Sequence, residues 1–152
     1  MSLTDNAKAY LEAFYSGGKL QDFTPTEVRA ALASAPVPEG LVNPPVAKVE
    51  ERQIPVKDGE ITVRIYTPEG QGPFPLFVYY HGGGWVIGDL ETSDAGCRLI
   101  AEQTKRVVVS VDYRLAPENP FPVPVEDSYA ALCWAYENAE EINAIRDDIV
   151  VG

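Results

Sequence analysis

Apolar residues recur at helical spacing in the first part of this sequence. One such stretch covers residues 5–15, and its apolar positions would share one face of a helix. A second begins after Thr24, where Pro25 occupies the first helical position and Glu27 stands three residues after the cap. Threonine and glutamate at this spacing form a capping box, and proline is favoured at the first helical position. We therefore predict two helices in this part of the chain.

The pattern changes at about residue 46. Prolines are concentrated between residues 35 and 45, which predicts an extended connector. In the segments that follow, apolar and polar residues alternate as they do in strands. We therefore expect two domains. Residues 1–45 would form the helices and the connector, and residues 46–152 would form a core of strands and helices.

Strand patterns dominate the second part. Residues 49–56 and 61–66 are joined by an Asp58-Gly59 turn, which predicts an antiparallel hairpin. Continuous apolar runs farther along predict strands that are covered on both faces. These runs are residues 76–80, 107–111 and 148–152.

Two helical patterns separate these three runs. The first begins at Thr92 or Ser93 and continues to about Lys105, and the second covers residues 125–136. Strands that alternate with helices imply right-handed crossovers and a parallel sheet. The fold class is therefore α/β, with a mostly parallel sheet, flanking helices and an antiparallel hairpin at one edge.

Composition narrows the range of partners. The formal net charge is −11, from 23 acidic and 12 basic residues, and this sign argues against nucleic acid and anionic membranes. The two cysteines, Cys97 and Cys133, lie within helical patterns and are expected to be buried free thiols, not metal ligands. The N-terminus lacks the pattern of a signal peptide, and no apolar run is long enough to span a bilayer. We expect a cytoplasmic protein without a metal.

The chemistry is concentrated in residues 81–85, His-Gly-Gly-Gly-Trp, directly after a predicted buried strand. Acyl transfer places negative charge on a carbonyl oxygen, and backbone N–H groups that point at this oxygen stabilise it. Glycine lets the backbone approach the substrate closely. We assign the two N–H donors of an oxyanion hole to Gly83 and Gly84. His81 is expected to support the loop, not to act as a general base.

Other residues of this loop are candidates for substrate binding. Gly82, Trp85, Val86 and Leu90 would line the acyl or alcohol pocket, and core packing is an equal alternative for the last three. A phosphate-binding loop is the main rival explanation for a run of glycines. The sequence has neither the G-x-x-x-x-G-K-[ST] pattern nor G-x-G-x-x-G after a strand, which favours the oxyanion interpretation.

Two motifs together make a family resemblance specific. Residues 79–85, Tyr-Tyr-His-Gly-Gly-Gly-Trp, are followed by Gly88-Asp89, and farther along by Asp-Tyr-Arg-Leu-Ala-Pro-Glu at residues 112–118. This combination resembles the hormone-sensitive-lipase-type branch of the α/β-hydrolases, the bacterial family IV carboxylesterases. The resemblance covers nearly the whole chain.

The resemblance implies a Ser-Asp-His triad, hydrolysis of carboxylic esters through an acyl-enzyme, and no cofactor. It also implies that the N-terminal helices form part of a cap over the active site, and that residues 46–152 are the first half of an α/β-hydrolase core that is incomplete in this chain. Residues 113–118 would have an architectural role. Small esters with short or medium acyl chains are the expected substrates.

The catalytic serine of this family lies in G-x-S-x-G on a strand-to-helix turn. Residues 148–152 match the strand before that turn. The chain has one histidine, His81, which the loop already uses, and no serine stands in a G-x-S-x-G pattern. We therefore expect the nucleophile, the acid and the histidine to lie beyond residue 152, in a complementary C-terminal polypeptide. This chain alone is expected to be inactive.

Other functions are left open by the sequence. A member of the same fold could hold a ligand without turnover, although a pure receptor has no need of oxyanion donors, and the chain could be an inactive fragment. Amide hydrolysis would use the same oxyanion geometry. A homo-oligomer is also left open. The residues that follow position 152 would separate an enzyme from a receptor.

Overall fold

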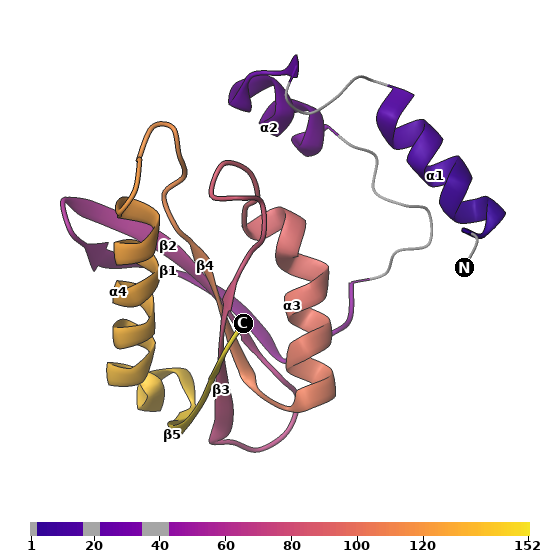
Figure 1. Cartoon of the computed structure of the whole chain (residues 1–152). Coiled ribbons are helices and arrows are strands. Elements are labelled where there is room, and N and C mark those ends of the chain that lie inside the picture. Colours follow the sequence, from indigo (N-terminus) through magenta and orange to yellow (C-terminus); the bar gives the residue numbers. More distant parts are fainter. Residues whose placement is uncertain (1–2, 17–21, 35–42) are drawn as a thin grey trace. The chain divides into compact units, whose positions relative to one another are not determined.

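The computed structural model describes residues 3–16, 22–34 and 43–152. The chain divides into two compact units, residues 1–36 and residues 37–152. The second unit carries the sheet (Figure 1). The glycine run at residues 82–84 belongs to this unit as well.

Two helices lie in the first unit, as the spacing of apolar residues predicts: α1 (Asp5–Ser16) and α2 (Pro25–Ala33). The capping box of α2 is confirmed. The Thr24 hydroxyl accepts a hydrogen bond from the Glu27 N–H (3.3 Å), and the Glu27 carboxylate accepts one from the Thr24 N–H (2.8 Å). Residues 35–42 of the predicted connector lie outside the described part of the chain.

Five strands form one sheet in the order β1-β2-β4-β3-β5. β1 (Lys48–Val56) and β2 (Gly59–Thr67) form the predicted antiparallel hairpin at one edge. β3 (Phe74–Tyr80) pairs in parallel with both β4 (Val107–Asp112) and β5 (Ala144–Val151), which confirms the crossovers. β2 and β4 are antiparallel, so the sheet is mixed.

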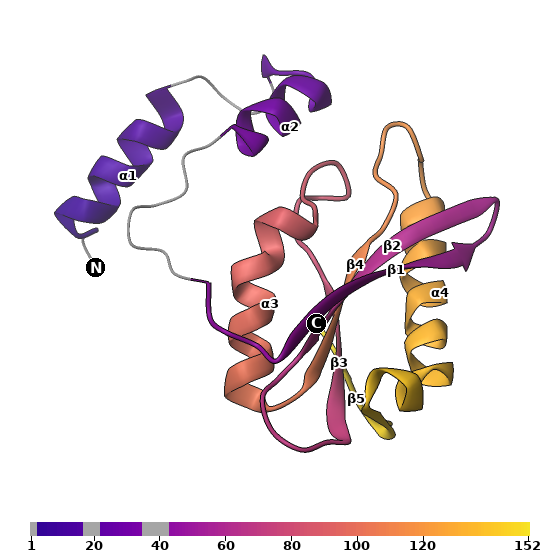
Figure 2. The ribbon, with the colours of Figure 1, turned by 180° about the vertical axis from the view of Figure 1, so that it is seen from behind.

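Two long helices cover opposite faces of the sheet (Figures 1 and 2). α3 (Leu90–Thr104) packs on one face, mainly against β4. α4 (Val123–Glu137) packs on the other face, and a short 3-10 helix, η2 (Ala139–Ile142), follows it before β5. The sheet is therefore the middle of three layers.

Branched aliphatic residues of the sheet fill the core on both faces. β4 shows why a continuous apolar run predicts a strand without an exposed face. Val109 and Val111 belong to the cluster on the α4 side and Val108 to the cluster on the α3 side, and all three are fully buried. Other buried members on the α4 side are Ile54, Ile61, Val63, Ile65, Leu76, Val78, Val107, Ala131 and Ala135.

The start of α3 differs from the prediction. The helix begins at Leu90, not after Thr92 or Ser93, because Asp89 is its N-cap. The Asp89 carboxylate accepts a hydrogen bond from the Thr92 N–H at 2.7 Å, and the Thr92 hydroxyl accepts one from the Asp89 N–H at 3.1 Å. Thr92 thus takes part in the cap as its third helical residue.

Two further boundaries also differ. α4 begins at Val123 instead of residue 125, because Pro124 is compatible with the first helical turn, where an N–H is not needed. β5 begins at Ala144 instead of residue 148. Its pairing with β3 is irregular, since Pro75 pairs with Ile145 but Leu76 with Ile149. This irregular stretch contains polar residues, so a continuous apolar run does not predict that it belongs to the strand.

Both cysteines are free thiols, as expected. Cys97 is buried, whereas Cys133 is only partly buried. Within the described ranges, no helix combines the length and apolar character that crossing a bilayer requires.

A network of charged groups fastens α3 to β2. Asp94 of α3 accepts hydrogen bonds from Tyr66 (2.9 Å), Arg98 (2.7 Å) and Arg64 (3.3 Å). Its side chain is 12% exposed. Burial works to raise the pKa of Asp94, but the hydrogen bonds and the charges of the two arginines outweigh burial and hold the pKa below its ordinary value.

We predict that Asp94→Asn lowers the free energy of unfolding at pH 7 by about 1.5–3 kcal/mol, the usual range for a hydrogen bond to a charged group. Folding lowers the pKa of Asp94, so its contribution is complete above the unfolded-state pKa of about 3.9. That contribution is lost as pH falls through the lower folded-state pKa. Urea unfolding at a series of pH values measures the difference between wild type and variant. The difference should narrow below about pH 4, and a constant difference would contradict the prediction.

Candidate active site

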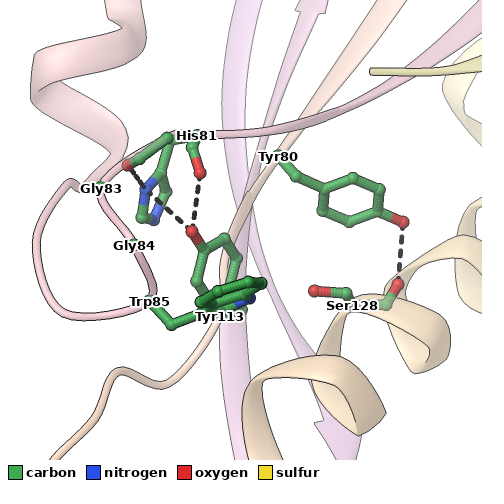
Figure 3. Close-up of a pocket in the computed structure, with 8 residues that line it drawn as sticks. Tyr80, His81, Gly83, Gly84, Trp85, Tyr113 and Ser128 are labelled. Atoms are coloured by element: carbon green, nitrogen blue, oxygen red, sulfur yellow. Dashed lines mark hydrogen bonds between the residues drawn. The ribbon is translucent and has the colours of Figure 1, made fainter.

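The loop that joins β3 to α3 contains the glycine run and lies at the carboxyl end of β3. β3 and β4 are parallel, and Tyr80 at the end of β3 pairs with Val111 near the end of β4. The segments that leave the two strands, residues 81–89 and residues 113–122, therefore begin side by side. They meet at the pocket shown in Figure 3.

The backbone of this loop adopts conformations that favour glycine. The angle φ is +128° at Gly83, +60° at Gly84 and +102° at Gly88. A Cβ on Gly83 would overlap the carbonyl oxygen of Ile87, and a Cβ on Gly88 would overlap the His81 ring. The turn therefore requires glycine at these two positions, both for its dihedral angles and for space.

The loop leaves two backbone donors unused. The Gly83 carbonyl oxygen accepts hydrogen bonds from the N–H groups of Val86 and Ile87, each at 3.1 Å, and these bonds close the turn. Within residues 43–152, no group accepts a hydrogen bond from the N–H of Gly83 or Gly84. Both glycines line the pocket. Their N–H groups are therefore available to a ligand.

His81 is buried, with 5% of its surface exposed, and its ring lies against the backbone of the loop. Nδ1 is 2.8 Å from the Gly82 carbonyl oxygen. A carbonyl oxygen can only accept, so Nδ1 carries the hydrogen and donates it. Nε2 is buried and has no hydrogen-bond partner among the described residues. His81 thus bonds to the turn itself, which is the geometry that a supporting residue needs.

Tyr113 belongs to the site although sequence reasoning does not select it. Its hydroxyl donates to the His81 carbonyl oxygen at 2.6 Å, and its ring stacks on the His81 ring, with 4.3 Å between centroids and 14° between planes. Tyr113 is buried, and burial raises the pKa of its hydroxyl. The sequence signal is the motif at residues 112–118, but only the fold brings that motif against the glycine loop.

The pocket beside the loop has a volume of about 340 Å³. On its far side, the Tyr80 hydroxyl donates to the Ser128 carbonyl oxygen at 2.8 Å (Figure 3). The Ser128 hydroxyl in turn donates to the Pro124 carbonyl oxygen at 2.7 Å. Trp85 is 60% exposed. The lining residues are Tyr80, His81, Gly82, Gly83, Gly84, Trp85, Tyr113 and Ser128.

Of the four residues that the sequence assigns to substrate binding, Gly82 and Trp85 line the pocket, whereas Val86 and Leu90 do not. The Val86 N–H donates a hydrogen bond to the Gly83 carbonyl oxygen. Leu90 is the first residue of α3 and is buried. For Leu90, the structure therefore supports the core-packing alternative.

The described residues of the pocket include two N–H groups without an acceptor, but no nucleophile paired with a base. Ser128 is the serine on the pocket wall, and its hydroxyl bonds to Pro124, not to a histidine. His81 is the single histidine of the chain, and its Nδ1 donates to Gly82. In the same described residues, no group of three potential metal ligands occurs.

Known proteins match this chain in sequence. The family model of the alpha/beta hydrolase fold matches residues 77–152. The carboxylic ester hydrolase LipN of Mycobacterium tuberculosis is 47% identical over 126 residues, which cover 82% of this chain and 32% of LipN. An arylesterase of Saccharolobus solfataricus is 34% identical over 152 residues, which cover 98% of this chain and 49% of the arylesterase.

A solved structure extends the likeness to three dimensions. The hyperthermophilic esterase of the archaeon Pyrobaculum calidifontis superimposes with a TM-score of 0.87 at 36% identity, over 99% of this chain and 49% of that protein. The chain thus spans about half or less of the length of these relatives. The fold and the resemblance expected from the two motifs are confirmed. The chain belongs to the α/β-hydrolase family, in its hormone-sensitive-lipase-type branch of bacterial family IV carboxylesterases.

Proposed function

We propose that this chain supplies the oxyanion hole of a carboxylic ester hydrolase. The observation that carries the proposal is the pair of unused N–H groups at Gly83 and Gly84, on the wall of a pocket, in a turn that requires glycine. The names of the relatives support it, since they are a carboxylic ester hydrolase, an arylesterase and an esterase.

The mechanism follows from where negative charge develops. A serine Oγ attacks the ester carbonyl carbon, the serine proton passes to a histidine, and the carbonyl oxygen becomes an oxyanion. The N–H groups of Gly83 and Gly84, with one N–H from the residue after the serine, bind this oxyanion. Each donor is worth about 2.7–4 kcal/mol in the transition state. The histidine then protonates the leaving alcohol, and water hydrolyses the acyl-enzyme.

The serine, the acid and the histidine are proposed to belong to a complementary C-terminal polypeptide, so that this chain alone is inactive. Two contacts support this division. Ser128 bonds to Pro124, and His81 already donates to Gly82, so neither forms a nucleophile–base pair. The length of the relatives is consistent with a second half.

Esters with short or medium acyl chains are the proposed substrates. A pocket of about 340 Å³ lies near the lower end of the range that binds small molecules, roughly 300–1,000 Å³. Gly82 and Trp85, which line it, are the proposed substrate-binding residues. Residues 1–45 are proposed to form the cap and its connector.

We predict that Gly83→Ala in the complete protein lowers kcat/KM for a p-nitrophenyl ester by about 10²–10³-fold, the loss typical of one oxyanion donor. A Cβ at this position would overlap the Ile87 carbonyl oxygen, so the peptide must rotate. Gly96→Ala is the matched control, because a Cβ there meets nothing within 4 Å. The control should keep full activity and gain about 0.5–1 kcal/mol of stability. Full activity of the Gly83 variant would exclude its N–H as a donor.

A fluorophosphonate probe should label a serine outside this chain. The protein would be isolated from its native cells with an antibody raised against residues 46–152, treated with the probe and weighed by intact mass spectrometry. A labelled species that contains or accompanies this chain supports the ester hydrolase, and its mass shows whether the complement is continuous with the chain. An unlabelled species of 16.6 kDa alone would favour a non-catalytic ligand-binding protein or an inactive fragment.

A further inference from the structure

Two hydrogen bonds tie the glycine loop to the segment that follows β4. The Tyr113 hydroxyl donates to the His81 carbonyl oxygen at 2.6 Å, and the Ala116 N–H donates to the Trp85 carbonyl oxygen at 2.8 Å. His81 and Trp85 stand on either side of the three glycines. Residues 113–116 therefore hold the glycine run at both of its ends, and we name this segment the strap.

The glycine loop needs contacts from outside it to hold a single conformation. Within the loop, two bonds to the Gly83 carbonyl oxygen and one from His81 Nδ1 to the Gly82 carbonyl oxygen close the turn. Trp85 has a left-handed backbone, with φ of +62°, which costs an L-residue roughly 1–2 kcal/mol. Successive glycines also have many alternative backbone states. Contacts from outside the loop therefore help to select the one conformation in which Gly83 and Gly84 line the pocket with N–H groups that bond to no described group.

An ion pair between partly exposed Arg114 and a buried carboxylate, that of Asp127, anchors the strap to α4. Asp127 is fully buried. Its two carboxylate oxygens accept from the Arg114 guanidinium at 2.7 and 2.8 Å, and one of them also accepts from the Arg114 backbone N–H at 3.1 Å. The guanidinium donates to the Lys57 carbonyl oxygen as well, at 2.8 Å. Bidentate pairing fixes orientation as well as distance, so the residue next to Tyr113 has a defined place.

The same turn of α4 also holds the start of the loop. Tyr80, the last residue of β3, donates its hydroxyl to the Ser128 carbonyl oxygen at 2.8 Å, and Ser128 follows Asp127 in the sequence. The residue before His81 and the residue after Tyr113 are thus both bonded to one turn of α4. This turn of α4 therefore holds both the loop and the strap in place.

We propose that Tyr113 and Asp127 are positioning residues that set the direction of the Gly83 and Gly84 N–H groups. Tyr113 acts on the loop directly, and Asp127 acts through Arg114. The proposal rests on the ester hydrolase function proposed above. Without the Tyr113 hydroxyl, the His81 carbonyl loses its partner, and the peptide units after it gain freedom to turn away from the pocket. The effect belongs to the transition state, where the oxyanion exists, and not to substrate binding.

Tyr113→Phe in the complete protein tests the proposal, because it removes the hydroxyl and keeps the stacked ring. We expect kcat for a p-nitrophenyl ester to fall by about 10-fold to 100-fold, with KM changed by less than about twofold. Asp127→Asn should act in the same direction, since the amide keeps the shape but not the charge that Arg114 binds. The inhibition constant of a trifluoromethyl ketone, which forms a tetrahedral oxyanion adduct, should rise in parallel.

Tyr66→Phe is the matched control. The Tyr66 hydroxyl is also buried and also has one defined acceptor, Asp94 of α3, at 2.9 Å. Its acceptor lies outside the glycine loop and the strap. We expect thermal stability to fall in both tyrosine variants but kcat to fall only in Tyr113→Phe. Equal kcat in wild type and Tyr113→Phe, or an equal fall in Tyr66→Phe, would overturn the positioning role.

A second measurement does not depend on turnover. The amide ¹H–¹⁵N signals of Gly83 and Gly84 should shift in Tyr113→Phe and stay in place in Tyr66→Phe. Unchanged signals in Tyr113→Phe would overturn the proposal. A complete wild-type protein that hydrolyses no ester would refute the proposed function, while these shifts would still decide whether Tyr113 positions the loop. If Asp127→Asn fails to fold, the results for Tyr113→Phe alone decide whether the proposal holds.

Discussion

The parallel pairing of β3 with β4 is the constraint on which the site depends. It places Tyr80 beside Val111, so the glycine loop and the strap leave the sheet next to each other. Tyr79 belongs to the cluster on the α3 side, whereas Tyr80 bonds to Ser128 on the α4 side. A slip of one residue would exchange these two faces, and the loop would lose its anchor on α4.

Backbone groups, not side chains, carry the chemistry proposed for this chain. An N–H group has no rotamers, so its direction is decided by φ and ψ and by whatever holds the peptide. The turn at Gly83 meets this need at the cost of conformational freedom, and the buried ring of His81 donates back to it. Side chains such as Tyr113 therefore matter through the geometry that they impose on the main chain.

Local sequence predicts local structure well in this chain. Residues within a few positions of each other explain three of the observed features: the valine strand β4, the Asp58-Gly59 turn and the capping box at Thr24. The predicted boundaries of helices and strands are wrong where a residue outside the apolar pattern decides where the element begins. Asp89 caps α3 ahead of the predicted start, and β5 begins before its apolar run because β3 offers a pairing partner to Ala144 and Ile145.

The sequence by itself determined the α/β class, the hairpin, the three parallel strands and the position of the glycine run, because periodicity, turn chemistry and the demand for glycine are local properties. The glycine motif is also the basis on which His81 is predicted to support the loop and Gly83 and Gly84 are proposed as donors. Only the tertiary structure decided that Tyr113 reaches His81 across 32 positions and that Tyr80 reaches Ser128 across 48. Strand register and helix packing create these contacts, and no spacing along the chain encodes them. The pocket wall and the anchor at Asp127 arise from the same packing.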